Sequence, residues 1–293
     1  MLTVVTAGCA ANGNVAARGT GGRVQVVAAE NFWGSIVRQL AGPDADVTSI
    51  ISNPETDPHD YEPTPDDARK IASAQLVIEN GIGYDPWAQQ LLAVDGDSGR
   101  KVLNVGHLLG IADGGNPHQW YSQASVERFI VQVTRDLEEL DPAHLSQYEQ
   151  RKRAFRVRAL SGYTALIARI RREFAGTAIG ASESIVAPLA ETLDLRLITP
   201  PKFLDAIAEG NEPTASDKAT VDAEIRDHTI KVFVFNSQNS TPDVQRLVDA
   251  ARAERIPVVT VTETPTPKNT TFAAWQVRQL RALSAALDQA AAK

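Results

Sequence analysis

Residues 141–174 read DPAHLSQYEQRKRAFRVRALSGYTALIARIRREF, and this stretch determines the fold that the sequence predicts. It holds no strand pattern and no proline after Pro142, and apolar residues recur at helical spacing from Phe155 to Phe174. Asp141 and Pro142 suit an N-cap and a first helical turn. We therefore predict one continuous helix, roughly 50 Å long at about 1.5 Å per residue, that ends at Gly176.

Short β-rich runs alternate with helical patterns on both sides of this helix. Before it, strands are expected at residues 24–29, 47–51, 75–79 and 101–105, and helices at 32–40 and 65–73. After it, strands are expected at residues 177–181, 196–198, 231–235 and 257–261, and a last helix at 271–290. This alternation predicts parallel sheets with helices on both faces.

The predicted fold class is α/β, with two lobes that each hold a mostly parallel sheet flanked by helices, joined by one long backbone helix. The N-terminal lobe is expected at residues 24–140, the linking helix at 141–175 and the C-terminal lobe at 176–293. A chain of 293 residues is long enough for two ordinary domains.

The composition separates some classes of protein from others. A hydrophobic fraction of 43% and a charged fraction of 22% are typical of a soluble globular protein. The net charge of −7 argues against a nucleic-acid surface, which is normally basic. No run beyond the N-terminal stretch is long enough to span a bilayer.

The N-terminal stretch, MLTVVTAGCA at residues 1–10, resembles the tail of a bacterial lipoprotein signal, whose cysteine becomes the lipidated first residue. That cysteine is Cys9, but a charged start is missing and Thr6 stands where leucine is more usual. The other interpretation is a frayed terminus with an unmodified cysteine, and the residues leave both open. Residues 10–23 are rich in Ala, Gly and Asn, which is typical of a flexible tether, so residues 1–23 are set apart from the lobes.

Two short stretches share a sequence pattern, DPHDYE at residues 57–62 and NPHQW at residues 116–120. Each places a histidine after a proline, with an aromatic ring two residues further on. Proline fixes φ and disfavours the helical region for the residue before it, so each histidine is expected on a stiff, extended loop. Imidazole is the commonest metal ligand. The pattern therefore favours His59 and His118 as metal ligands.

Two carboxylates occupy comparable places in the second lobe. Glu183 follows the strand expected to end at residue 181, and Glu263 follows the strand expected to end at residue 261. Ligands of open α/β sheets bind beyond the carboxyl ends of the strands. For each glutamate taken alone, a helix-start carboxylate or a surface residue remains the alternative.

Several motifs together resemble one known family, the metal-binding receptor proteins of bacterial ABC importers for zinc and manganese, known as cluster A-I solute-binding proteins. The resemblance covers about residue 24 to the C-terminus. It rests on DPHDYEP at 57–63, NGIGYDPW at 80–87, NPHQW at 116–120, Ser182-Glu183 and NEPT at 211–214. The chain departs from the family's usual Asp-Pro-His-x-Trp, because Asn116 replaces the aspartate. The His-rich insertion of many zinc receptors is also missing between His59 and His118.

The resemblance implies a metal site formed by His59, His118, Glu183 and Glu263, in the cleft between two four-stranded lobes on a rigid helix. It implies an extracytoplasmic receptor, not an enzyme, that binds Mn²⁺ or Zn²⁺ and delivers it to an ABC permease. Such a receptor would be a monomer, anchored to the outer face of the cytoplasmic membrane as a lipoprotein through Cys9. We expect both ions to bind, with zinc tighter in solution and a slight preference for manganese as the transported ion.

Two other functions remain as alternatives. A metal-dependent hydrolase would keep an open coordination position for water, and four protein ligands with no spare base near them argue against it. A receptor for a metal chelate such as haem or a siderophore would need a broad aromatic or cationic cleft, and only 6% of the residues are aromatic. The sequence also lacks a complete dinucleotide fingerprint, a P-loop, a nucleophile elbow and a His-Glu-x-x-His motif.

Overall fold

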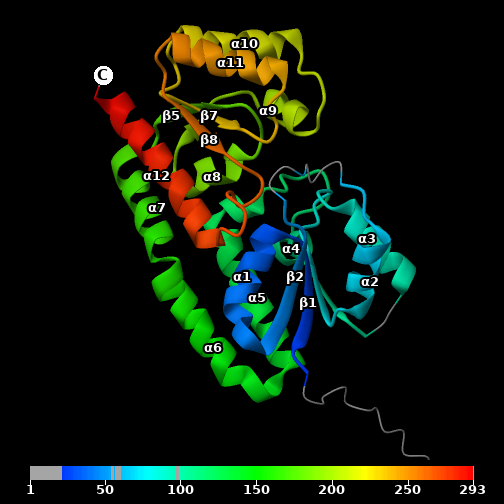
Figure 1. Ribbon diagram of the computed structural model, residues 1–293. Coiled ribbons are helices and arrows are strands. Elements are labelled where there is room, and N and C mark those ends of the chain that lie inside the picture. Colours follow the sequence, from blue (N-terminus) through cyan, green and yellow to red (C-terminus); the bar gives the residue numbers. More distant parts are fainter. Residues whose placement is uncertain (1–21, 54–55, 57–60, 97–98, 293) are drawn as a thin grey trace, which may run out of the picture.

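The computed structural model describes residues 22–53, 56, 61–96 and 99–292. It contains two separate sheets of four parallel strands, each flanked by helices (Figure 1). This confirms the predicted α/β fold class. The predictions for Cys9 and for His59 lie outside the described residues.

The first sheet has the strand order β2-β1-β3-β4. Its strands are β1 (Val24–Glu30), β2 (Ala45–Ile51), β3 (Leu76–Glu79) and β4 (Lys101–Asn104). Its helices are α1 (Asn31–Ala41), α2 (Pro65–Ser73), α3 (Pro86–Asp95), α4 (Val105–Leu109) and α5 (Gln123–Leu140). The central strand β3 is buried along its whole length, as expected for a strand covered on both faces.

The second sheet repeats this arrangement with the order β6-β5-β7-β8. Its strands are β5 (Ala178–Ala181), β6 (Arg196–Leu197), β7 (Val232–Asn236) and β8 (Val258–Val261). Its helices are α8 (Val186–Leu193), α9 (Pro201–Ala208), α10 (Ala215–Arg226), α11 (Pro242–Ala253) and α12 (Phe272–Ala291). In both sheets the strand order reverses beside the first strand, which is where open α/β sheets bind ligands.

The helical rod between the lobes is not the regular α-helix that the sequence predicts. A 3₁₀ turn (Pro142–His144) leads into α6 (Leu145–Ala154), a π-helical turn follows at Phe155–Ala159, and α7 (Ser161–Phe174) completes the rod. The amide of Leu160 donates to the carbonyl oxygen of Phe155 at 2.9 Å, a step of five residues instead of four. The break in α-helical geometry lies just before Gly162.

Burial explains the π turn. Phe155 and Leu160 are both buried, at 3% and 4% exposure, whereas Val157 between them is 74% exposed. Residues five apart point in different directions from an α-helix but share a face across one π turn. The apolar residues that predict a regular helix continue from Phe155 to Ala159 at α-helical spacing. In the structure the buried face shifts by one residue, to Leu160.

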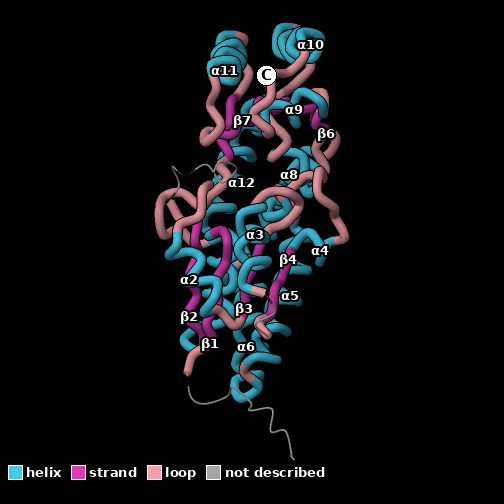
Figure 2. The backbone as a smooth tube through the Cα atoms, turned by 90° about the vertical axis from the view of Figure 1, so that its right-hand side faces the viewer, coloured by secondary structure: helices cyan, strands magenta, loops and turns pink. Residues whose placement is uncertain are grey.

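One hydrophobic core extends through both lobes and connects them, and a second, smaller cluster lies in the first lobe. α12 packs along α7 on the outer side of the molecule (Figure 1), and Arg169 of α7 forms an ion pair with Asp288 of α12. Phe272, at the start of α12, donates its backbone N–H to Ser35 Oγ of α1 at 2.9 Å. Figure 2 shows the strands of the two sheets toward opposite ends of the molecule.

Within the described part of the chain, no helix combines the length and the apolar character needed to cross a membrane.

Candidate metal centre

Three of the four predicted ligands lie together in the structure. His118, Glu183 and Glu263 each offer one ligand atom, and these atoms all lie within 4.8 Å of one another. The three residues are buried, with 1%, 1% and 4% exposure respectively. His118 Nε2 is 3.8 Å from Glu263 Oε1. The chain thus brings one imidazole and two carboxylates from distant positions into one buried cluster.

The strand order of the second sheet explains this convergence. Glu183 follows β5, Asn236 ends β7 and Glu263 follows β8, and these three strands are neighbours. Parallel strands end at the same edge of a sheet, so the side chains after them meet there. His118 comes from the segment between α4 and α5 of the other lobe. The cluster therefore lies between the lobes.

His118 is oriented by Asn116, the residue that departs from the family pattern. The Asn116 Oδ1 atom accepts the backbone N–H of His118 at 2.9 Å and lies 3.0 Å from His118 Nδ1. The Asn116 Nδ2 atom donates to the carbonyl oxygen of Ser184 at 2.7 Å. Because Oδ1 can only accept, Nδ1 of the neutral ring carries the proton, and Nε2 keeps the lone pair that a metal ligand needs.

The two carboxylates are held by neutral hydrogen-bond donors. Asn236 Nδ2 lies 2.7 Å from Glu183 Oε1 and 3.0 Å from Glu263 Oε1. Asn239 Nδ2 donates to Glu183 Oε2 at 2.7 Å, and the Tyr84 hydroxyl donates to Glu263 Oε2 at 2.6 Å. These bonds orient the carboxylates without neutralising their charge. A carboxylate oxygen has two lone pairs, so a single hydrogen bond does not by itself prevent it from binding a cation.

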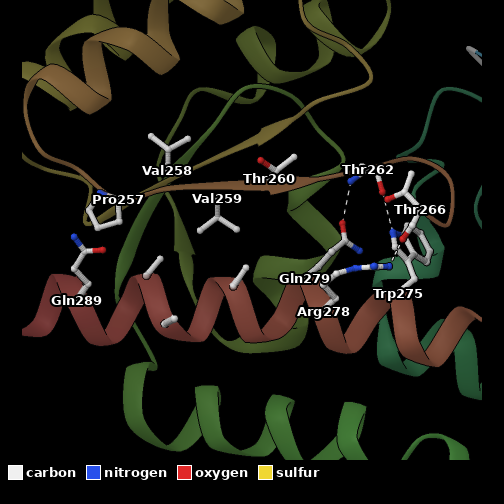
Figure 3. A pocket seen from close by; sticks show the side chains of 13 residues that line it. Pro257, Val258, Val259, Thr260, Thr262, Thr266, Trp275, Arg278, Gln279 and Gln289 are labelled. Atoms are coloured by element: carbon white, nitrogen blue, oxygen red, sulfur yellow. Dashed lines mark hydrogen bonds between the residues drawn. The ribbon is translucent and has the colours of Figure 1, made fainter. Parts of the chain in front are cut away.

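The C-terminal helix fixes the loop that carries Glu263. The backbone N–H of Thr262 donates to Gln279 Oε1 at 2.9 Å, and Trp275 Nε1 donates to Thr262 Oγ1 at 2.8 Å; both bonds run between α12 and the end of β8 (Figure 3). On the other side, the Tyr121 hydroxyl donates to the carbonyl oxygen of Thr262 at 2.8 Å. Both lobes therefore hold the residue that precedes Glu263.

Tyr84 reaches Glu263 from a tight loop after β3. The Asp85 carboxylate accepts the backbone N–H groups of Asn80 and Gly81, each at 2.7 Å. This closes residues 80–85 on themselves and directs Tyr84 toward the second lobe, where it meets Glu263.

The Asn-Gly-x-Gly sequence of this loop has a conformational cause. Gly81, Ile82 and Gly83 all have positive φ, at 70°, 60° and 79°. A Cβ atom on Gly81 would lie 2.5 Å from the side chain of Asn104, so glycine is needed there for space as well as for φ. Ile82 adopts the left-handed region despite its branched side chain, which is a strained arrangement.

Buried acids support the same loop from the first sheet. Burial raises the pKa of Asp85 to about 6 and that of Glu79 to about 7. Burial, and then repulsion from Asp85, raises the pKa of Glu30 well above its usual range. Glu30 also shares a side-chain hydrogen bond with Asp85. These groups shape the loop that carries Tyr84.

The sequence prediction did not include Asn236, Asn239 and Tyr84. Asn236 could have been found, because it directly follows the predicted strand at 231–235, at the same sheet edge as the two glutamates. Tyr84 lies inside the NGIGYDPW stretch, but nothing local indicates that its hydroxyl contacts a residue 179 positions away. Asn239 follows β7 in a loop, and no local pattern distinguishes it.

Comparisons with known proteins find a matching family model and several related proteins. A family model described as zinc-uptake complex component A, periplasmic, matches residues 26–286. The manganese-binding lipoprotein MntA of Halalkalibacterium halodurans is 29% identical over 147 residues, which cover 48% of this chain and 48% of MntA. The iron-binding protein YfeA of Yersinia pestis is 31% identical over 142 residues, covering 46% of this chain and 45% of YfeA. The chain thus spans about half the length of the curated relatives it matches.

Solved structures share the fold. A manganese-bound mutant of the periplasmic metal-binding protein from Candidatus Liberibacter asiaticus matches with a TM-score of 0.76 at 21% identity, covering 90% of this chain and 99% of that one. A mutant of the laminin-binding adhesin from Streptococcus agalactiae matches with a TM-score of 0.73 at 19% identity, with the same coverage. Each likeness covers nine-tenths of this chain and shows the shared fold.

Proposed function

We propose that this chain, which belongs to the family of zinc-uptake complex component A, is an extracytoplasmic receptor for a divalent transition metal ion. The members of this family are metal-binding substrate-binding proteins of ABC transporters and not enzymes. In the proposed function the ion, Mn²⁺ or Zn²⁺, binds between the lobes and is handed to an ABC permease.

One observation carries this proposal, the buried cluster of His118, Glu183 and Glu263. Burying two carboxylates side by side is costly unless a cation or other partners compensate their charge. The hydrogen bonds from Asn236, Asn239 and Tyr84 come from neutral groups, and a divalent cation bound here would compensate the charge of both carboxylates. Because the donor residues are at most 4% exposed, the site suits a bare ion better than a bulky chelate such as haem.

The donor set bears on the choice of metal. With His59 as the fourth ligand, the site offers two imidazole nitrogens and two carboxylates, each of which supplies one or two oxygens. Oxygen donors and five or six bonds suit Mn²⁺, whereas Zn²⁺ favours four-coordinate sites. Divalent affinities generally rise from Mn²⁺ toward Cu²⁺, and Zn²⁺ lies above Mn²⁺, so we expect both ions to bind and zinc to bind more tightly. The oxygen donors of the two carboxylates favour manganese as the transported ion.

The cellular setting is part of the same proposal. Relatives such as MntA of Halalkalibacterium halodurans are named lipoproteins, and the stretch around Cys9 resembles a lipoprotein signal. The receptor then acts as a monomer on the outer face of the cytoplasmic membrane, held there by a lipid on Cys9, and no nucleic acid takes part.

Thermal unfolding of the metal-free protein, with and without Mn²⁺ or Zn²⁺, tests the function. An ion that binds only the folded state raises the free energy of unfolding by about 2.7 kcal/mol when its concentration is a hundred times Kd. Wild type is therefore expected to have a higher melting temperature with either ion. His59→Ala removes one proposed ligand and is expected to lose most of that shift. If neither ion raises the melting temperature of wild type, the receptor function is wrong. If His59→Ala shifts as much as wild type, His59 is not a ligand.

A further inference from the structure

We propose that Asn236 is a positioning residue that sets the arrangement of the two glutamate ligands and so biases the site toward manganese relative to zinc. This inference rests on the proposed function and adds to it the residue that governs metal selection. It starts from one nitrogen atom, Asn236 Nδ2, which lies within hydrogen-bond distance of both carboxylates.

The hydrogen bonds of Asn236 fix the orientation of its amide. Asn236 Oδ1 accepts the backbone N–H of Gln238 at 3.0 Å, so the oxygen faces the chain and Nδ2 faces the carboxylates. Both hydrogens of Nδ2 are then engaged, one with Glu183 and one with Glu263. The backbone N–H of Asn236 donates to Ser182 Oγ at 3.1 Å, and the residue is fully buried. The amide therefore has one orientation, set from both ends.

Asn236 acts through the ligands and is not itself a ligand. Its Nδ2 atom has no lone pair for a metal, and its Oδ1 atom faces the amide of Gln238 instead of the cluster. Its effect is to bridge two like charges that would otherwise move apart in a buried site. The bridge is neutral, so the negative charge that attracts the cation is preserved.

The remaining oxygens are held as well, which fixes the planes of both carboxylates. Glu183 is held at one oxygen by Asn236 and at the other by Asn239. Glu263 is held at one oxygen by Asn236 and at the other by Tyr84. Rotating either carboxylate breaks at least one of these bonds. The bridge is the only one of these contacts that restrains both ligands at once.

This rigidity affects Mn²⁺ and Zn²⁺ differently. Four-coordinate Zn²⁺ takes one short bond, about 2.0–2.2 Å, from each carboxylate oxygen donor, which requires the carboxylates to turn toward the ion. An ion with higher coordination can use both oxygens of a carboxylate held in place. The bridge therefore resists the zinc geometry more than the manganese geometry. Without the bridge, the affinity for zinc rises relative to the affinity for manganese.

The test compares Asn236→Ser with a matched control, Asn239→Ser. Serine at 236 can still accept the N–H of Gln238 in a similar turn, but its hydroxyl is too short to bridge both carboxylates. Asn239→Ser removes one hydrogen bond to Glu183 and one to the carbonyl oxygen of Ile207, and it leaves the bridge intact. Competition titrations measure the ratio of Zn²⁺ to Mn²⁺ affinity for each protein. The visible absorption of bound Co²⁺, which is stronger in four-coordinate sites than in six-coordinate ones, reports the coordination.

We expect Asn236→Ser to lose roughly 10–100-fold in Mn²⁺ affinity, the usual effect of removing a group that orients a ligand. Zn²⁺ affinity should fall less, so the ratio rises and the Co²⁺ absorption strengthens, whereas Asn239→Ser changes the ratio less. Equal losses for both ions with an unchanged Co²⁺ spectrum, or a ratio that falls, would overturn the inference. If wild type binds neither ion, the proposed function itself fails. Circular dichroism checks the fold, and Asn236→Thr replaces a serine variant that does not fold.

Discussion

Single residues of the candidate metal centre link the two lobes and also orient the ligands. Asn116 is the clearest case, because its oxygen orients His118 while its nitrogen donates to Ser184, the neighbour of Glu183. An aspartate at this position could still orient the imidazole. It could not donate to the carbonyl of Ser184, since an ionised carboxylate only accepts hydrogen bonds. The asparagine therefore couples the two halves of the site in a way that the family's usual aspartate cannot.

Asn116→Asp should lower the stability of the metal-free protein. The variant loses the bond to Ser184 and sets a partly buried carboxylate oxygen against a carbonyl, at a cost of about 1–3 kcal/mol. Urea denaturation in the presence of a chelator measures the change. Gln289→Glu, the same change of amide to acid on an exposed residue, is the control and should stay close to wild type. Equal stability of Asn116→Asp and the control would show that this contact contributes nothing.

The candidate ligands were easier to find from the sequence than the residues that hold them. Glu183 and Glu263 each follow a predicted strand, and the family resemblance selects them as ligands. Asn236 satisfies the same rule of placement. Tyr84 and Asn116 act through partners that are 179 and 68 positions away, so no local pattern could indicate their hydrogen bonds. A contact between distant residues depends on how the lobes pack, which sequence spacing does not contain.

At the level of elements, the end of β3 combines a buried acid with a tight loop. Glu79, the last residue of β3, accepts a hydrogen bond from Asn104 at 2.7 Å, while burial raises its pKa to about 7. Asp85 and Asp113 add repulsion in the same direction. A pKa raised from 4.5 to about 7 means that folding favours the protonated form. The stability that depends on this proton is complete below pH 4.5 and is lost as the pH rises through about 7.

Glu79→Gln should therefore gain stability relative to wild type as the pH rises. Glutamine keeps an acceptor for Asn104 but carries no charge, so the gain is up to about 1.4 kcal/mol per pH unit within the titration window. Chemical denaturation at about pH 5 and about pH 8 measures the difference between the two proteins. Glu191→Gln on the exposed face of α8 should show no such trend. A constant difference between Glu79→Gln and wild type at both pH values would contradict a buried, titrating Glu79.

The rod between the lobes shows where a sequence pattern misled the prediction. Apolar residues at 155 and 159 satisfy α-helical spacing, and the pattern alone favours a regular helix. The structure instead buries Leu160, because a π turn lets it share a face with Phe155. Nothing in the local sequence forbids either solution. The choice depends on which side chain fits against the core, and that is settled by packing.

At the scale of the whole molecule, two sheets with the same strand order present their carboxyl ends to a shared boundary. The sequence predicted all eight strands to within two residues at each end, because apolar β-rich runs alternate with amphipathic helices. It did not predict which strands are neighbours, since strand order depends on crossover connections. That order brings Glu183, Asn236 and Glu263 to adjacent strand ends. Cross-lobe bonds from Tyr84, Asn116 and Tyr121 then complete the site around His118.

The most direct test counts the metal ions bound per chain. Equilibrium dialysis of wild type against Mn²⁺ or Zn²⁺, followed by elemental analysis, should find one tightly bound ion per chain. His118→Ala should lose that ion, because it removes a ligand from a buried cluster with no spare imidazole among the described residues around it. His144→Ala changes a histidine whose side chain is 42% exposed, and it should keep the ion. Retention of the ion by His118→Ala at the affinity of wild type, or a wild type that binds none, would contradict a metal site between the lobes.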